Sequence, residues 1–138
     1  MKRRDLRSKV LVWGTFDNLH DGHRRFLEQA SRLGLLYVIV VPDDAVLENK
    51  GRAPLFAAED RAAQLRMLPF VAGVQIDSWA GGLESLRVLQ PNYFCAGYDQ
   101  SRDWEMQLIQ FCKSAGLRIG YIRLGEYAGG IHSSHLRT

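Results

Sequence analysis

An uninterrupted apolar run constrains the fold more than any other stretch of this chain. It includes Leu36 to Val41 and is followed directly by Pro42. A strand without a polar face has no side to turn toward water, so it is expected in a sheet covered on both faces, as parallel sheets are. Pro42 lacks the amide hydrogen that would continue the ladder and marks the end of the strand. The run therefore predicts a parallel sheet between two layers of helices.

Other strand-like and helix-like stretches alternate along the chain. The remaining expected strands are 10–13, 74–77, 93–96 and 117–124, and the apolar stripes of the expected helices begin at Phe26, Ala58, Leu83 and Trp104. The stretch Asp43 to Phe56 is charged and contains Gly51 and Pro54, so we expect a loop there. The alternation predicts a single α/β domain with a Rossmann-like, doubly wound sheet of about five parallel strands. This domain is expected over residues 10–138, after a basic N-terminal arm at residues 1–9.

Composition and charge argue against several classes of partner. The 138 residues are 46% hydrophobic and 24% charged, as in ordinary soluble globular proteins. The net charge of +3 comes from the arm, which has five basic residues against one acidic residue. Such an arm is most often a solvated tail, so neither nucleic acid nor a membrane is expected as a partner. Cys95 and Cys112 lack CxxC spacing and are expected to be buried free thiols. Together with the absence of a leader-like or membrane-spanning apolar run, they favour the cytoplasm.

The loop after the first expected strand carries the chemistry. From Gly14 to His23 it reads GTFDNLHDGH and ends where a helix begins. The first amide hydrogens of a helix lack partners within the helix and lie at the positive end of its dipole, so they attract anions such as phosphate. The rings of His20 and His23 can both donate to one phosphate, and Gly22 lets another group approach the main chain closely. The loop therefore predicts a site for phosphate chemistry.

Two common phosphate-binding motifs are excluded, and two alternative roles for the histidines remain. The loop has neither the G-x-G-x-x-G of dinucleotide-binding folds nor the Gly-Lys-Ser/Thr of a Walker A loop. The spacing of His20 and His23, repeated by His132 and His135, is compatible with zinc. Zinc sites of that kind usually add a carboxylate or thiolate at a defined spacing, and none can be placed here. No metal ligand is therefore assigned among the side chains. Surface histidines without a role are the other alternative.

The motifs resemble those of the cytidylyltransferase-like nucleotidyltransferases, whose signature is G-T-F-D followed by H-x-G-H. This chain has Gly14-Thr15-Phe16-Asp17 and His20-Asp21-Gly22-His23. Later motifs follow in the family's order: Lys50-Gly51-Arg52, Glu59-Asp60-Arg61, Gly97-Tyr98-Asp99-Gln100, and Glu126-Tyr127 before His132-Ser133-Ser134. In these elements the chain is most similar to the archaeal-type FAD synthases, which are FMN adenylyltransferases. The resemblance covers nearly the whole chain.

The resemblance implies an enzyme that transfers a nucleoside monophosphate from a nucleoside triphosphate to a phosphorylated acceptor and releases pyrophosphate. Mg²⁺ is the implied cofactor, with ATP or CTP as the substrate, and FMN adenylylation is the first expectation. Cytidylyl transfer to glycerol 3-phosphate or another small phosphate ester is the alternative. A different class is a nucleotide-binding regulatory module without turnover. Pairing of two copies through exposed helix faces is common in parallel-sheet enzymes of this size, so a homodimer is kept as an expectation.

Individual roles follow from the matched positions. His20 and His23 are expected to hold the α- and β-phosphates, and Lys50 and Arg123 to supply positive charge. The expected nucleotide-binding residues are Gly14, Thr15, Phe16, Asp17, Gly22, Arg61, Gly97, Asp99, Ser133 and Ser134. Asp17 is expected to orient the loop or approach Mg²⁺ rather than to act as a base. Each of these residues also has a role without a ligand. Lys50, Arg61 and Arg123 would then be solvated surface charges, Asp99 would form an Asx turn, and the two serines would cap a helix.

Overall fold

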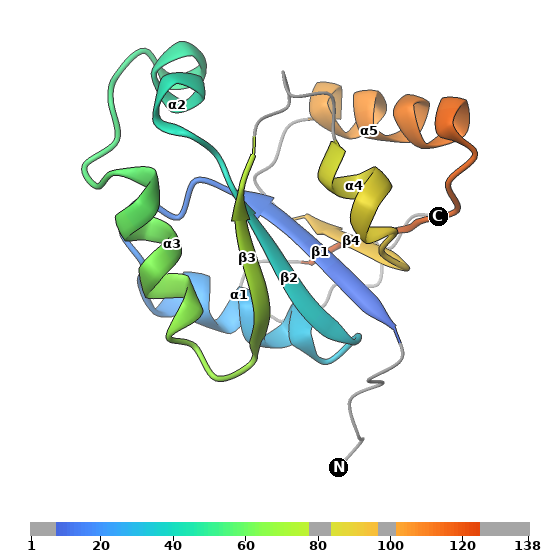
Figure 1. The fold of residues 1–138 in the computed structure, drawn as a ribbon, viewed down its shortest axis with the longest axis horizontal. Helices are drawn as coiled ribbons and strands as arrows, with labels where there is room; N and C mark the ends of the chain where they lie inside the picture. The colour runs from blue at the N-terminus through green and yellow to red at the C-terminus, as the bar shows by residue number, and fades with distance from the viewer. Residues whose placement is uncertain (1–7, 78–83, 97–101, 125–138) are drawn as a thin grey trace.

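A computed structural model shows a five-stranded parallel sheet with helices on both faces (Figure 1). It describes residues 8–77, 84–96 and 102–124. The strands are β1 (Lys9–Gly14), β2 (Leu35–Val40), β3 (Val71–Ile76), β4 (Tyr93–Ala96) and β5 (Gly120–Arg123). Their order is β3-β2-β1-β4-β5, so the direction of winding reverses between β1 and β4. The predicted Rossmann-like sheet is confirmed.

The described residues form five helices, and helices cover both faces of the sheet. They are α1 (Asp21–Ser31), α2 (Asp43–Lys50), α3 (Ala58–Arg66), α4 (Glu84–Leu89) and α5 (Arg102–Ala115). Successive side chains of a strand point to opposite faces, and β1 shows this directly. Val10 and Val12 pack with the buried residues of α1 and α3, whereas Leu11 and Trp13 pack with those of α4 and α5. Each face of the sheet therefore has its own apolar core.

The predicted loop from Asp43 to Phe56 is wrong for its first eight residues, which form α2. Two acidic residues occupy the first turn and Lys50 the last, as the helix dipole favours. Gly51 ends the helix in the left-handed conformation, with φ 75°, and its amide donates to the carbonyl of Leu47 at 2.8 Å. Among the described side chains of this helix only Val46 is buried, so no periodic apolar stripe distinguishes it from a charged loop.

Smaller differences concern strand ends and the cysteines. β3 begins at Val71, three residues before the predicted start, and β5 is shorter than the predicted 117–124. Cys95 and Cys112 are buried free thiols, as predicted. None of the helices in the described ranges has the length and apolar character needed to cross a bilayer.

Candidate active site

The loop between β1 and α1 leaves the sheet beside its switch point. In open parallel sheets a crevice forms there, outside the carboxyl ends of the strands, and ligands bind in it. Gly14 ends β1, and its carbonyl accepts from the amide of Val41 at 3.0 Å, which fixes the end of β1 against the end of β2. β4 pairs with the other side of β1. The structure thus presents the expected phosphate loop at the edge where this fold binds ligands.

Phe16 fixes the turn that the loop makes as it leaves β1. Its backbone adopts a left-handed conformation, with φ 52°, which costs free energy for a residue with a side chain. Burial of the ring in the core below the loop compensates, since Phe16 is 8% exposed. Gly14 is required by this turn, because a Cβ there would lie 2.7 Å from a carbon of the Phe16 ring. Phe16 therefore anchors the loop to the core.

His20 caps the start of α1 with its own side chain. Its Nδ1 accepts from the amides of Gly22 at 3.0 Å and His23 at 3.3 Å. These two amides are therefore already engaged, which differs from the expectation that the first amides of the helix are available to phosphate. An imidazole that accepts at Nδ1 carries its hydrogen at Nε2 when it is neutral. His20 thus presents a donor on the side of the ring away from the helix.

His23 lies directly against His20. The two rings are stacked, with centroids 3.8 Å apart and planes 18° from parallel. Phe16 and His23 make a T-shaped contact, with ring centroids 5.4 Å apart and planes at 72°. Stacking places both imidazoles at the same helix start. The structure therefore brings together the two histidines that the sequence singled out.

Asp17 holds the segment after α2 against the phosphate loop. Its two carboxylate oxygens accept from the amides of Leu55 at 2.7 Å and Phe56 at 2.9 Å. Desolvation is the largest influence and raises the pKa of Asp17, but the two amides and the charges of Arg61 and Lys50 outweigh it and leave the pKa below its usual value. Asp17 is therefore an ionised anchor between the phosphate loop and the segment after α2.

Arg61 is a buried side chain that connects the segments around the phosphate loop. Its side chain is fully buried in α3, and it donates to the carbonyls of Phe56 at 2.9 Å and Thr15 at 2.8 Å. A third bond, at 2.7 Å, joins it to the carboxylate of Asp43 at the start of α2. The guanidinium links the phosphate loop, α2 and the segment before α3. Arg61 was predicted to be a nucleotide-binding residue, because a tertiary partner such as Asp43 leaves no mark in the local pattern.

The two other predicted cations lie on different sides of the switch point. Lys50 is exposed in the last turn of α2, and its charge contributes to the lowered pKa of Asp17. Arg123 ends β5 and is buried, with Nη2 3.1 Å from the hydroxyl of Tyr121. β5 pairs with β4 in the sheet, two positions from β1. The predicted site residues Gly97, Asp99, Ser133 and Ser134 lie outside the described residues.

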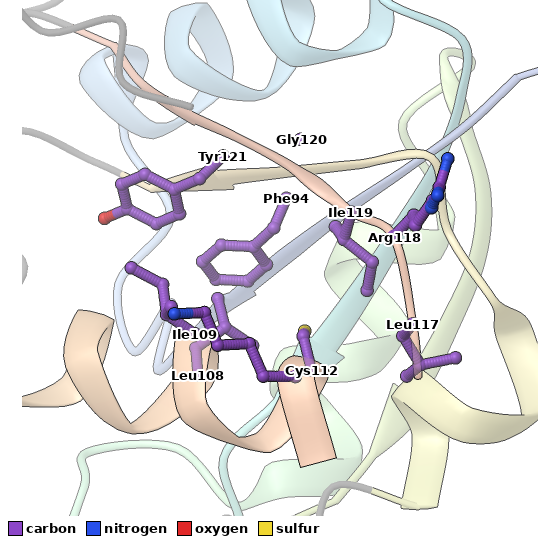
Figure 2. Close-up of a pocket in the computed structure, with 10 residues that line it drawn as sticks. Phe94, Leu108, Ile109, Cys112, Leu117, Arg118, Ile119, Gly120 and Tyr121 are labelled. Carbon is purple, nitrogen blue, oxygen red and sulfur yellow. The ribbon is translucent and has the colours of Figure 1, made fainter. Parts of the chain in front are cut away.

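A separate cavity of about 580 Å³ lies between β5 and the C-terminal half of α5 (Figure 2). The stacked rings of Phe94 and Tyr121, with centroids 5.8 Å apart, form part of its wall. Leu117, Arg118 and Ile119, which precede β5, also line it. These residues lie at or before the amino-terminal halves of β4 and β5, whereas the phosphate loop leaves the carboxyl end of β1. The cavity is therefore not part of the phosphate site.

Comparisons with known proteins agree with this geometry. The cytidylyltransferase-like family model matches residues 11–138. A FAD synthase of Pyrococcus abyssi is 42% identical over 120 residues, covering 86% of this chain and 80% of that protein. A FAD synthase of Pyrococcus horikoshii is 40% identical over 122 residues, covering 87% of this chain and 82% of that protein. Both alignments extend over most of each chain.

Solved structures give the same result at the level of the fold. A crystal structure from Thermoplasma volcanium, described as a lipopolysaccharide core biosynthesis protein, matches with a TM-score of 0.79 and 28% identity, covering 87% of this chain and 98% of that one. A pantoate-beta-alanine ligase of Francisella tularensis matches at a TM-score of 0.55 and 14% identity, covering 86% and 59%, and shares the fold alone. The chain belongs to the cytidylyltransferase-like family and is a nucleotidyltransferase.

Proposed function

We propose that the protein transfers AMP from ATP to FMN, forming FAD and releasing pyrophosphate. The observation that carries this proposal is the stacked His20–His23 pair at the start of α1, beside the switch point of the sheet. The identity to the FAD synthases of two Pyrococcus species supports FMN as the acceptor. It favours FMN over glycerol 3-phosphate and ATP over CTP.

The reaction needs positioning and fixed charge. An oxygen of the FMN phosphate attacks the α-phosphorus of ATP, a new phosphorus–oxygen bond forms, and the bond to the departing pyrophosphate breaks. Negative charge grows on the non-bridging oxygens and on the leaving group, where preorganised donors accelerate the step most. The Nε2 donor of His20 and the ring of His23 supply such donors. Lys50 and Arg123 add positive charge toward the phosphates from the two sides.

Two residues have supporting roles. Asp17 is not a base in this scheme, because both of its oxygens accept backbone amides and the FMN phosphate arrives as an anion. Arg61 is a positioning residue, since its three bonds hold the phosphate loop by the carbonyl of Thr15. Phe16 and Gly14 set the turn on which the histidines stand. Thr15 and Gly22 contribute main-chain positions of the same loop.

A divalent metal, for which we propose Mg²⁺, would neutralise part of the triphosphate charge and orient the leaving group. Within the described ranges, no three histidine, cysteine, aspartate or glutamate side chains lie close enough together to hold a metal. Mg²⁺ keeps several waters and is commonly held through substrate phosphates. We therefore propose that ATP carries the metal into the site.

A two-by-two assay of pyrophosphate release tests the proposal. The purified protein is incubated with ATP or CTP and with FMN or glycerol 3-phosphate, in the presence of Mg²⁺. We expect release only with ATP and FMN, and a loss of about 10²–10³-fold in kcat for His23→Ala, the effect of removing one oxyanion donor. Release with CTP and glycerol 3-phosphate would reject the FMN assignment. ATP binding without release from either acceptor would favour the regulatory module. A His23→Ala turnover within threefold of the parent would reject the role of the ring.

A further inference from the structure

Two large apolar side chains stand in solvent beside the phosphate loop. Leu55 is 78% exposed and Phe56 is 39% exposed, in the segment between α2 and α3. Among the described residues, three of the six exposed large apolar side chains fall within residues 47–56. Clustered exposure of this kind often marks a surface that binds another molecule, whereas single exposed apolar residues are ordinary.

The backbone that carries this apolar pair is held in place by two charged side chains. Asp17 accepts both amides, and Arg61 takes the carbonyl of Phe56. A loop that only connects two helices needs no such fixation, and its amides can be left to water. These contacts fix the backbone of Leu55 and Phe56 before any ligand binds. The backbone therefore loses less conformational entropy when a ligand binds to the pair.

The same contacts set the position of the pair relative to the reacting phosphates. Asp17 lies three residues before His20, and Arg61 also holds the carbonyl of Thr15. The phosphate loop and the apolar pair are thus tied to each other through two side chains. Lys50 is exposed and precedes the pair in the chain, and its charge reaches Asp17, whose pKa it lowers. An acceptor with a phosphate at one end and an apolar group at the other matches this arrangement of charge.

We propose that Leu55 and Phe56 form the platform on which the flat ring system of the acceptor rests. The inference rests on the proposed function, in which the acceptor is FMN. The phosphate of FMN must reach the histidines, and a flexible five-carbon chain separates that phosphate from the rings. Contact with an aromatic face and a branched apolar side chain stabilises a flat ring more than it stabilises a small polar ester. The pair therefore selects a flavin over glycerol 3-phosphate.

Flavin fluorescence tests this platform without requiring turnover. We compare the parent with Leu55→Ser, Phe56→Ala and Phe56→Trp in titrations with FMN and with riboflavin, which has the ring and no phosphate. Met67→Ser is the matched control, because Met67 is 82% exposed and follows the end of α3 that is farther from the apolar pair. ATP affinity is measured in parallel by calorimetry. The thermal unfolding midpoint of each variant identifies any that fails to fold.

We expect Leu55→Ser and Phe56→Ala to raise Kd for both flavins at least fivefold, with Kd for ATP within twofold of the parent. Phe56→Trp and Met67→Ser should keep parental flavin affinity. If the parent makes FAD but Leu55→Ser and Phe56→Ala bind flavin within twofold of it, the platform is rejected and the proposed function stands. If the parent neither binds riboflavin nor makes FAD, both are rejected. Because Leu55 is mostly exposed, its variant remains informative if Phe56→Ala unfolds.

Discussion

Substitution of Asp17 tests the contact that holds Leu55 and Phe56 against the phosphate loop. In the parent, two backbone amides donate to its carboxylate at 2.7 and 2.9 Å. Asp17→Asn keeps the size of the side chain but has only one acceptor oxygen, so its amide nitrogen faces a backbone donor. We therefore expect Asp17→Asn to behave like Asp17→Ala, although it is the more conservative change.

The expected loss is limited by the exposure of the partners. Hydrogen bonds to a charged group contribute about 1.5–3 kcal/mol each, but the amides of Leu55 and Phe56 lie in an exposed segment and regain water. We expect the free energy of unfolding to fall by about 1–3 kcal/mol in total at pH 7. The loss concerns a surface segment and leaves the two cores intact.

The pH dependence gives the refutable part of this prediction. The pKa of Asp17 is lower in the folded protein than its usual value, so its contribution is fully present above the unfolded pKa of about 3.9. The contribution is lost as the pH falls through the folded pKa, because the protonated carboxyl no longer accepts both amides. Urea denaturation of parent and variant at pH 7 and at stepwise lower pH should show a difference that narrows below about pH 4. A variant within about 0.5 kcal/mol of the parent at pH 7, the size of an ordinary surface change, would refute the reasoning. So would a difference that is independent of pH.

Three further predictions concern the cap, the buried arginine and the thiols. His20→Asn should lose activity but retain the helix cap, and with it the stability of the parent. His20→Ala should lose activity and also about 1 kcal/mol of unfolding free energy. Equal stability of the two variants would contradict the capping role. Arg61→Met should lower the free energy of unfolding by about 2–4 kcal/mol, because two carbonyls lose their donor. A urea midpoint of unfolding equal to that of the parent would contradict this structural role. Burial raises the pKa of Cys95 to about 12 and also raises that of Cys112, so a thiol reagent at pH 8 should modify both only after unfolding. Rapid labelling of Cys95 in the native protein would contradict its burial.

The local sequence pattern was sufficient to predict the parallel sheet and the position of the phosphate loop. The run from Leu36 to Val41 indicates a strand buried on both faces, and β2 is such a strand. The glycine and the histidines of the loop after β1 mark a turn and a pair of donors whose spacing puts them at one helix start. These features are local, because each depends on residues within one turn or one strand.

Tertiary contacts account for what the sequence did not reveal. α2 was expected to be a loop, because it buries little and its signals are charges at its two ends. Arg61 was expected to bind the nucleotide, because an arginine near a phosphate motif has the same appearance in the sequence whether it faces a ligand or Asp43. The capping of α1 by His20 was also missed, because histidine is not among the usual capping residues. The exposure of Leu55 and Phe56 was not predicted either, because it depends on the contacts that Asp17 and Arg61 make with their backbone.

The central claim is that AMP passes from ATP to the phosphate of FMN at the histidine pair. The most direct measurement follows ATP labelled at the α-phosphorus during incubation with FMN and Mg²⁺, with His23→Ala as the comparison. The account predicts that label appears in FAD in a one-to-one ratio with released pyrophosphate, and that the rate falls by about 10²–10³-fold in the variant. Absence of label from flavin, or a variant rate within threefold of the parent, would contradict it.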